Sequence, residues 1–178
     1  YVWGDLAGDL DRRRCDLRLV NLETAITTAG TPEPKGINYR MHPGNVGVLA
    51  AAAIDGCSLA NNHAMDWGRA GLVETLDALN LAGVGHAGAG RNAQEAARPL
   101  TLGVPGRGRV LVIAFGTKDS GVPPDWAAGV NTPGVALLPG SLDETVAAVR
   151  RQVRPLRREA DLLVLSIHWG GNWGYGVP

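Results

Sequence analysis

The chain has 178 residues, 45% of them hydrophobic, and its 17 basic residues balance its 17 acidic ones. This composition predicts a single folded domain over residues 1–178 and excludes a disordered chain. A net charge of zero argues against a protein whose main task is to coat nucleic acid or an anionic membrane. The longest apolar run, Val46 to Ile54, is about half of the roughly 20 residues that a membrane-spanning helix needs, so we expect no membrane segment here.

Short apolar runs alternate with amphipathic stretches in the first half of the chain. We predict strands over residues 16–22, 56–60 and 84–86, and a helix-like stretch from His42 to Ala53 that Pro43 opens. A clear helix contains Leu72, Leu76 and Leu79, which recur at i, i+4 and i+7. Gly83 then stands where a helix C-cap is expected.

The second half of the chain predicts two further helices, a hairpin and a last strand. Asn92 caps a brief helix that Pro99 ends, and residues 100–104 and 109–115 flank a turn and predict a β-hairpin. Residues 116–140 are irregular, which in a compact domain indicates a functional or mobile loop. Ser141 opens a capping box for a helix to about Glu159, which Pro155 should kink or end. Residues 162–167 predict the strongest strand, so we expect an α/β fold with a mostly parallel sheet and one hairpin.

The chain contains two cysteines, Cys15 and Cys57. They could pair, but two thiols do not make a disulfide framework. We therefore favour two buried free thiols.

Three predicted strands run directly into polar side chains. The first is followed by Glu23, the second by Asn61, Asn62 and His63, and the last by His168. Because the carboxyl ends of parallel strands share one edge of a sheet, these groups should converge on a single crevice. Carboxylate, amide oxygen and imidazole together suit a divalent ion such as Mn, Fe or Zn.

Each of these residues also has a purely structural interpretation. Glu23 can cap the segment that begins at Thr24, the two asparagines can form a turn, and either histidine can be a hydrogen-bonded structural residue. Asp66 follows His63 by three residues and can either orient the imidazole or bind backbone in the turn. Three tryptophans flank the expected site, although core packing is the default for each of them: Trp67, Trp169 and Trp173.

The block Asn61-Asn62-His63-Ala64-Met65-Asp66-Trp67-Gly68 resembles the CapA family, which is named for poly-γ-glutamate capsule biosynthesis and is similar to calcineurin-like metallophosphoesterases. Asn21-Leu22-Glu23, Gly88-Ala89-Gly90 and Ser166-Ile167-His168-Trp169-Gly170 occur in the order of that family. The resemblance implies a four-layer α-β-β-α sandwich with a two-metal site at one sheet edge.

Carried over by position, the resemblance also implies residue roles. Glu23, Asn62 and His168 would be metal ligands, and His63 with Asp66 would be catalytic. The expected substrate-binding residues are Lys35, Arg40, Asn61, Trp169 and Asn172. For Lys35 and Arg40 the alternative is an exposed charge in a loop.

The chain departs from the family pattern at three places. No apolar strand ending in Gly-Asp precedes Asp16, and no Gly-His-x-His motif follows His168. Many members have Glu where Asn172 stands. We therefore expect a domain incomplete at both ends, with about half of the ligands for a dinuclear site that the full-length protein would complete.

Two functions fit these residues. The first is a metal-dependent hydrolase or transferase that acts on an anionic or amide-linked substrate, in the poly-γ-glutamate capsule pathway that the resemblance implies. The second is a non-catalytic component of capsule polymer synthesis or export that binds a polyanionic chain, within a capsule-synthesis complex. Flanking sequence with the two missing motifs would favour the enzyme. The sequence leaves the substrate, the metal and the compartment open.

Overall fold

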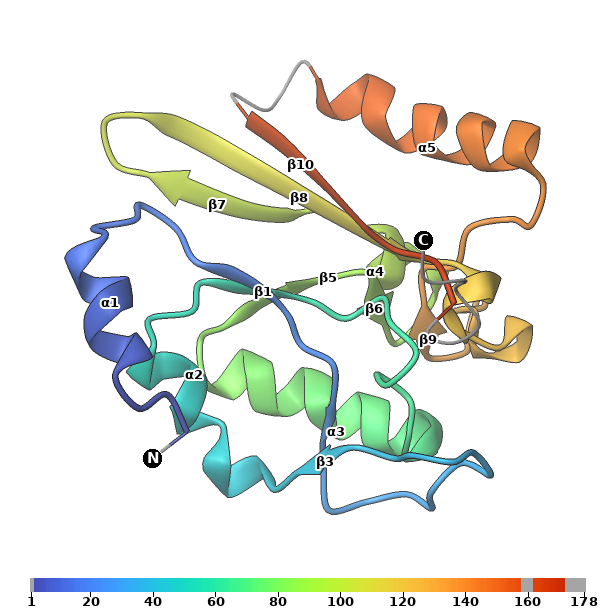
Figure 1. Ribbon diagram of the computed structural model, residues 1–178. Helices are drawn as coiled ribbons and strands as arrows, with labels where there is room; N and C mark the ends of the chain where they lie inside the picture. The colour runs from blue at the N-terminus through green and yellow to red at the C-terminus, as the bar shows by residue number, and fades with distance from the viewer. Residues whose placement is uncertain (1, 158–161, 172–178) are drawn as a thin grey trace, which may run out of the picture.

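Two three-stranded sheets pack against each other in the computed structural model, which describes residues 2–157 and 162–171 (Figure 1). The first is parallel and has the order β1 (Leu19–Asn21), β4 (Gly56–Ser58), β5 (Gly85–Ala87). The second has the order β10 (Leu162–His168), β8 (Gly108–Gly116), β7 (Leu100–Val104). Strand β10 is parallel to β8, whereas β7 and β8 form the expected antiparallel hairpin. The prediction of an α/β fold with mostly parallel strands is confirmed.

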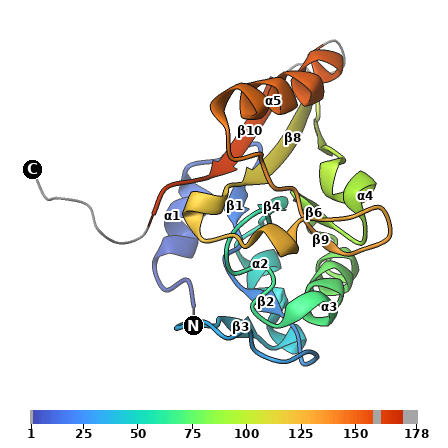
Figure 2. The same cartoon turned by 90° about the vertical axis from the view of Figure 1, so that its right-hand side faces the viewer.

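Helices cover the outer faces of the two sheets (Figure 2). α3 (Gly68–Leu81) packs on the first sheet through Leu72, Leu76 and Leu79, which are fully buried at the predicted helical spacing. The short helices α1 (Leu6–Arg12), η1 (Pro43–Asn45) and α2 (Gly47–Ala51) lie at the same side. α5 (Leu142–Leu156) covers the second sheet, and its Leu156 packs against Leu111, Ile113 and Phe115.

The two sheets meet closely at Gly88, between β5 and the two-residue strand β6 (Ala89–Gly90). Its φ is +86°, and a Cβ atom there would lie 2.7 Å from the Cβ of Ala60 and 2.8 Å from the Cβ of Ala114. Ala60 follows the first sheet and Ala114 belongs to the second. Glycine is therefore required both for the backbone conformation and for the close approach of the sheets.

The long irregular stretch contains more structure than the sequence indicated. It holds η2 (Lys118–Ser120), η3 (Pro124–Trp126) and β9 (Gly134–Val135), and β9 pairs antiparallel with β6. Another pair of two-residue strands, β2 (Ala25–Ile26) and β3 (Arg40–Met41), is parallel. Side-chain caps at Asn92 and Ser141 open α4 (Ala93–Ala97) and α5 as predicted.

Other boundaries differ from the predictions. β1 covers only the end of the predicted strand 16–22. α5 ends at Leu156, one residue after Pro155, and the predicted end at Glu159 lies outside the described residues. Cys15 and Cys57 are both free, but the prediction of two buried thiols is wrong for Cys15, which is exposed just after α1. No helix in the described part of the chain is long and apolar enough to span a membrane.

Candidate functional site

The polar residues that follow β1 and β4 lie at one edge of the first sheet, as their parallel pairing requires. His168 ends β10, which belongs to the second sheet and not, as expected, to the same sheet as β1 and β4, and it reaches this edge through its contact with Asn62. Glu23 and His63 approach each other with 4.0 Å between Oε1 and Nε2. The side-chain oxygen of Asn62 lies 3.0 Å from Nε2 of His168. The contact between Asn62 and His168 joins the two sheets, because Asn62 follows β4 of the first sheet and His168 is the last residue of β10 in the second sheet.

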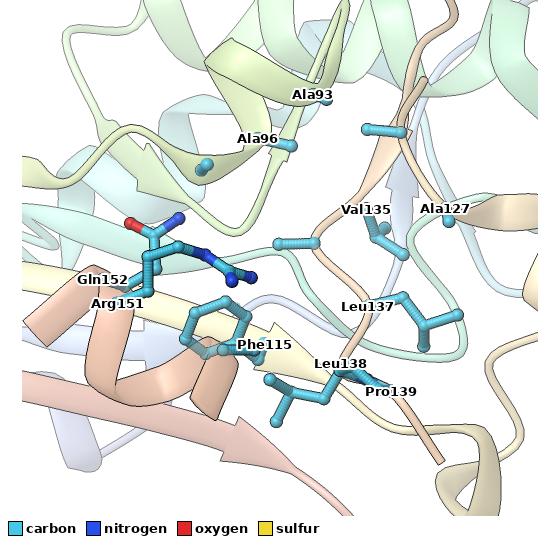
Figure 3. Close-up of a pocket in the computed structure, with 14 residues that line it drawn as sticks. Ala93, Ala96, Phe115, Ala127, Val135, Leu137, Leu138, Pro139, Arg151 and Gln152 are labelled. Carbon is cyan, nitrogen blue, oxygen red and sulfur yellow. The ribbon is translucent and has the colours of Figure 1, made fainter. Parts of the chain in front are cut away.

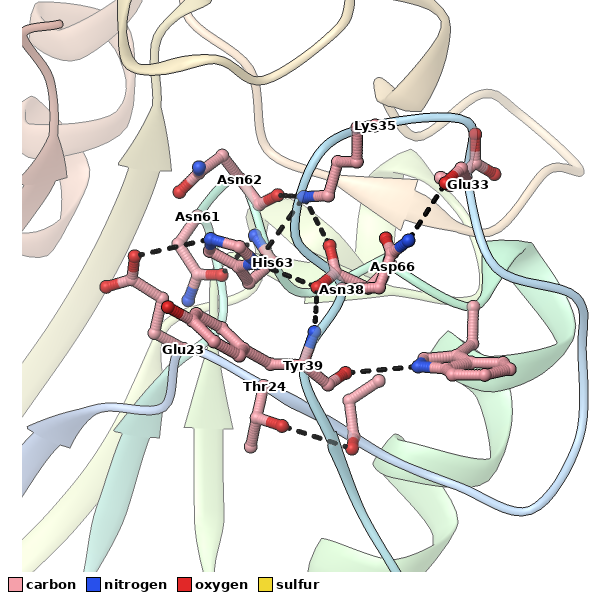
Figure 4. Close-up of polar contacts among 12 residues, drawn as sticks. Glu23, Thr24, Glu33, Lys35, Asn38, Tyr39, Asn61, Asn62, His63 and Asp66 are labelled. Carbon is pink, nitrogen blue, oxygen red and sulfur yellow. Dashed lines mark hydrogen bonds and ion pairs between the residues drawn. The ribbon is translucent and has the colours of Figure 1, made fainter. Parts of the chain in front are cut away.

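A buried carboxylate holds the imidazole of His63 (Figure 4). Asp66 is 0% exposed, and its Oδ2 lies 2.7 Å from Nδ1 of His63. The same oxygen accepts the backbone N–H of Tyr39 at 2.5 Å. Because a carboxylate only accepts, this contact places a proton on Nδ1 and leaves Nε2 toward Glu23. Asp66 thus serves both of the roles considered for it: it orients the imidazole and binds backbone.

Lys35 is the cation beside this carboxylate. Its ammonium group forms an ion pair with Asp66 Oδ1, donates to the backbone carbonyl of Asn62 and lies 3.4 Å from Nδ1 of His63. The ammonium nitrogen of Lys35 also lies 5.3 Å from the ring centre of Trp126. The side chain is only 27% exposed. Lys35 is therefore not a free loop charge.

Three residues with no predicted role in the site support it. The ring of Tyr39 lies 4.2 Å from the ring of His63. Asn21 donates to Glu23 Oε2 at 2.8 Å and accepts from Asn61 at 3.0 Å. Trp126, which the sequence did not connect with the site, is buried beside Lys35. The Asn21-Leu22-Glu23 triplet contained a signal for Asn21, whereas no local pattern marks Tyr39 or Trp126.

Asn61 is fully enclosed by protein. Its side-chain amide donates to Asn21 and to the carbonyl of Leu22, and its oxygen accepts the backbone N–H of His63 at 3.0 Å. The residue is 0% exposed. These contacts fix the turn that presents His63, and they occupy the atoms that were expected to contact substrate.

Of the remaining predicted substrate residues, the structure describes Arg40 and Trp169. Arg40 donates from Nε to the carbonyl of Thr27 at 2.7 Å, and its guanidinium lies 4.0 Å above the ring of Trp67. Trp169 is 71% exposed, so core packing is excluded for it. Asn172, like Trp173, lies outside the described residues.

The loop after β8 fixes the end of β10. The backbone and hydroxyl of Thr117 both donate to the carbonyl of His168. Asp119 accepts the backbone N–H of Gly170 at 3.1 Å. A hydrogen bond from the Thr117 side chain lowers the pKa of Asp119, with smaller help from the Gly170 N–H against the opposing effect of desolvation. This loop therefore places the carboxylate of Asp119 against the backbone of Gly170, which follows His168 by two residues.

The donor atoms at this edge are of the kinds that hold a borderline divalent ion. Glu23, Asn62 and His168 supply a carboxylate, an amide oxygen and an imidazole nitrogen. The 3.0 Å between Asn62 Oδ1 and His168 Nε2 is compatible with two neighbouring ligands that each lie about 2.1 Å from one ion. Among residues 2–157 and 162–171, no group of three or more His, Cys, Asp or Glu side chains is gathered closely enough to hold a metal ion. The described donors therefore fit part of a ligand set.

Comparison with known proteins places this chain among capsule proteins. A probable polyglutamine synthesis accessory protein of Mycobacterium tuberculosis is 41% identical over 179 residues, which cover 99% of this chain and 47% of that protein. The capsule biosynthesis protein CapA of Bacillus anthracis is 29% identical over 143 residues, covering 78% of this chain and 32% of the relative.

The PGA biosynthesis protein CapA of Bacillus subtilis is 29% identical over 139 residues, covering 78% of this chain and 34% of the relative. The chain thus spans about half the length, or less, of these relatives. The family model for the bacterial capsule synthesis protein PGA_cap matches residues 1–178. The chain therefore belongs to the PGA_cap family of bacterial capsule synthesis proteins.

Proposed function

We propose that this chain forms part of a metal-dependent hydrolase or transferase that acts on an anionic or amide-linked substrate during synthesis of a glutamate-polymer capsule. The observation that carries this proposal is the buried His63–Asp66 pair, which lies beside Glu23 and at the same edge as the Asn62–His168 contact. A histidine used only for packing would not need a buried carboxylate behind one ring nitrogen and a second carboxylate, that of Glu23, facing the other.

The packing of the elements is consistent with a four-layer α-β-β-α sandwich of the metallophosphoesterase type. α3 packs on the first sheet, the two sheets pack on each other, and α5 packs on the second sheet. In such an arrangement the site lies where strand ends of both sheets meet. The Asn62–His168 contact is in that position.

Glu23, Asn62 and His168 are the residues that would hold a divalent ion such as Mn, Fe or Zn, with further ligands completing a dinuclear site in the intact protein. When bound, such ions supply an activated water and neutralise negative charge on the substrate. Nε2 of His63, which lies 4.0 Å from Glu23 Oε1, would accept a proton from a bound substrate or water or, once protonated, donate it to a leaving group. Asp66 keeps the imidazole in that orientation, and the Tyr39 ring limits its rotation.

Metal content and turnover of the intact protein test this proposal. We expect bound Mn, Fe or Zn by mass spectrometry, and cleavage of bis-p-nitrophenyl phosphate or γ-glutamyl-p-nitroanilide as the two substrate classes. His63→Ala should lower turnover by about 10²- to 10⁴-fold with an unchanged circular dichroism spectrum, because it removes the proton-transfer group. His168→Ala should lower the metal content.

His42→Ala is the matched control, because His42 is exposed and its ring accepts only the backbone N–H of Gly44. It should leave metal content and turnover unchanged. Intact protein without metal under all loading conditions, or full turnover in His63→Ala, would contradict the proposal.

The second candidate is a non-catalytic component that binds a polyanionic chain within a capsule-synthesis complex. The incomplete cluster of metal-binding side chains in the described residues favours it, as does the word "accessory" in the name of the mycobacterial relative. Binding of a glutamate polymer by intact protein that neither holds metal nor turns over either substrate would support this second function.

A further inference from the structure

The C-terminal half of α5 carries a row of exposed arginines. Arg150, Arg151, Arg154 and Arg157 are all exposed, and none of their side chains forms a hydrogen bond or ion pair with any part of the chain that the structure describes. Several arginines elsewhere contrast with them. Arg91, for example, pairs with Asp77 and Glu95.

Three of these arginines lie on one side of the helix. Arg150, Arg154 and Arg157 are spaced at i, i+4 and i+7, so they form a stripe about 10 Å long. A surface groove of about 410 Å³ runs beside them and is lined by Val149, Arg150, Val153, Arg154 and Arg157. Arg151 lies about 100° further around the helix, where it lines a separate, alanine-rich pocket against Phe115 together with Gln152 (Figure 3).

The apolar side chains in the C-terminal half of α5 are packed against the protein and not free for a lipid surface, whereas the exposed Leu142 and Val146 lie in its N-terminal half. Leu156 is buried, and Val149 and Val153 pack against the second sheet with Leu163 and Ile167. An interfacial membrane helix would need this face to enter the bilayer. The overall net charge of zero also disfavours a nucleic-acid surface, which normally extends over a strongly basic domain.

We infer that the groove on α5 binds a polycarboxylate chain, of the kind a glutamate polymer presents. The guanidinium group is planar and pairs with a carboxylate through two parallel hydrogen bonds, so a row of unpaired arginines suits a ligand that repeats carboxylates along its length. Single exposed pairs of this kind are weak, and several along one chain add up through multivalency.

This binding surface is separate from the candidate site. α5 ends where β10 begins, and the seven residues of β10 lead to His168 (Figure 1). At about 3.3 Å per residue, the Arg157 end of the row is about 20 Å from His168 along the sheet. The Arg150 end is about 10 Å closer, because α5 runs back along β10 (Figure 1). Only a long polymer would contact both, and the α5 groove would retain such a polymer near the site.

The inference rests on the proposed link to a glutamate polymer, and binding in EDTA tests it independently of any metal or turnover. We would measure the affinity of the intact protein for fluorescent poly-γ-glutamate of about 50 residues, for a tri-γ-glutamyl peptide, and for oligo-dT of matched charge. We expect binding of the long polymer that weakens with salt, and much weaker binding of the tripeptide and of oligo-dT.

The triple variant Arg150→Gln/Arg154→Gln/Arg157→Gln should weaken polymer binding about tenfold, whereas three Arg→Lys substitutions at the same positions should weaken it less. The charge-matched control is Arg12→Gln/Arg13→Gln/Arg107→Gln, at exposed positions on α1 and the hairpin, and we expect it to change the affinity less than twofold. Turnover of a small substrate should be the same in all variants.

Three results would overturn the inference: no binding of the polymer by the wild type, an equal loss in the control variant, or equally tight binding of oligo-dT. The last would identify a general polyanion surface instead. Loss of turnover with retained polymer binding would count against the proposed enzyme and leave this surface in place.

Discussion

Lys35→Met should destabilise the protein more than its position in a surface loop suggests. The substitution keeps the length of the aliphatic side chain and removes the cation that pairs with Asp66. The carboxylate would still accept from His63 and Tyr39, but it would be a fully buried negative charge without its counter-ion.

The expected cost follows from the burial of the pair. Breaking a buried ion pair typically costs about 3–5 kcal/mol, and Lys35 is 27% exposed whereas Asp66 is 0% exposed. We therefore expect a cost near the lower end, about 2–4 kcal/mol. In an Asp66→Asn background there is no buried carboxylate for Lys35 to neutralise, so the same Lys35→Met change should cost less than about 1 kcal/mol.

The assay is urea unfolding at pH 7, followed by tryptophan fluorescence, for the wild type, both single variants and the double variant. Arg91→Met is the control, because its pair with Asp77 has side chains 39% and 55% exposed; it should cost about 0–1 kcal/mol. If Lys35→Met costs no more than this control, and its cost is the same in the wild-type and Asp66→Asn backgrounds, then Lys35 does not compensate the buried charge.

Three further outcomes are expected. A hydrogen bond from Thr27, followed by the backbone N–H groups of residues 28 and 29, lowers the pKa of Glu74 to about 2 from 4.5. The contribution of the Glu74 carboxylate to stability is therefore complete above about pH 4.5 and is lost as the pH falls toward 2. The free energy of unfolding, measured with urea at several pH values across that window, should show this loss in the wild type and not in Glu74→Gln. Gly88→Ala should cost about 2–4 kcal/mol, because its Cβ would meet both sheets at a positive φ, whereas Gly103→Ala, with open space around it, should be nearly neutral in the same assay. Burial raises the pKa of the Cys57 thiol to about 12, so a thiol reagent at pH 8 should label the exposed Cys15 alone in native protein; two labelled thiols would contradict this.

The strand pattern was sufficient to predict which edge of the molecule gathers Glu23, Asn62, His63 and His168. For Glu23, Asn62 and His63 the reason is that apolar runs predict strands, and the parallel strands β1 and β4 bring their carboxyl ends together. His168 joins them for another reason, because β10 lies in the second sheet and the two sheets meet at this edge. The strong helix signals also held, because the leucines of α3 and the cap of α5 act within a few residues of each other. The chemical roles of the gathered side chains remain predictions.

The surroundings of His63 could not be predicted in the same way. Tyr39 and Lys35 reach the site because the loop between β2 and β3 folds back over it, and that loop is held by long-range contacts. Glu74 of α3, for example, accepts hydrogen bonds from Thr27, Thr28 and Ala29. Nothing in the local sequence of the loop encodes a partner more than 40 residues away.

The two-residue strands were missed for a related reason. β2, β3, β6 and β9 are too short to show any periodicity of hydrophobic residues. They exist because their neighbours hold them side by side, as β9 is held against β6 next to α4.

The contact between Asn62 and His168 also has a consequence for how the site is assembled. The two residues are 106 positions apart in the chain, and β10 is the last of the described strands to leave the ribosome. Contacts of such long sequence separation form late in folding, after local helices and hairpins. The His63–Asp66 pair, only three residues apart, can form with the first sheet, whereas the contact between Asn62 and His168 cannot exist until β10 has docked on β8. The contact that joins the two sheets at this edge therefore depends on the docking of β10, whereas the His63–Asp66 pair depends on the first sheet alone.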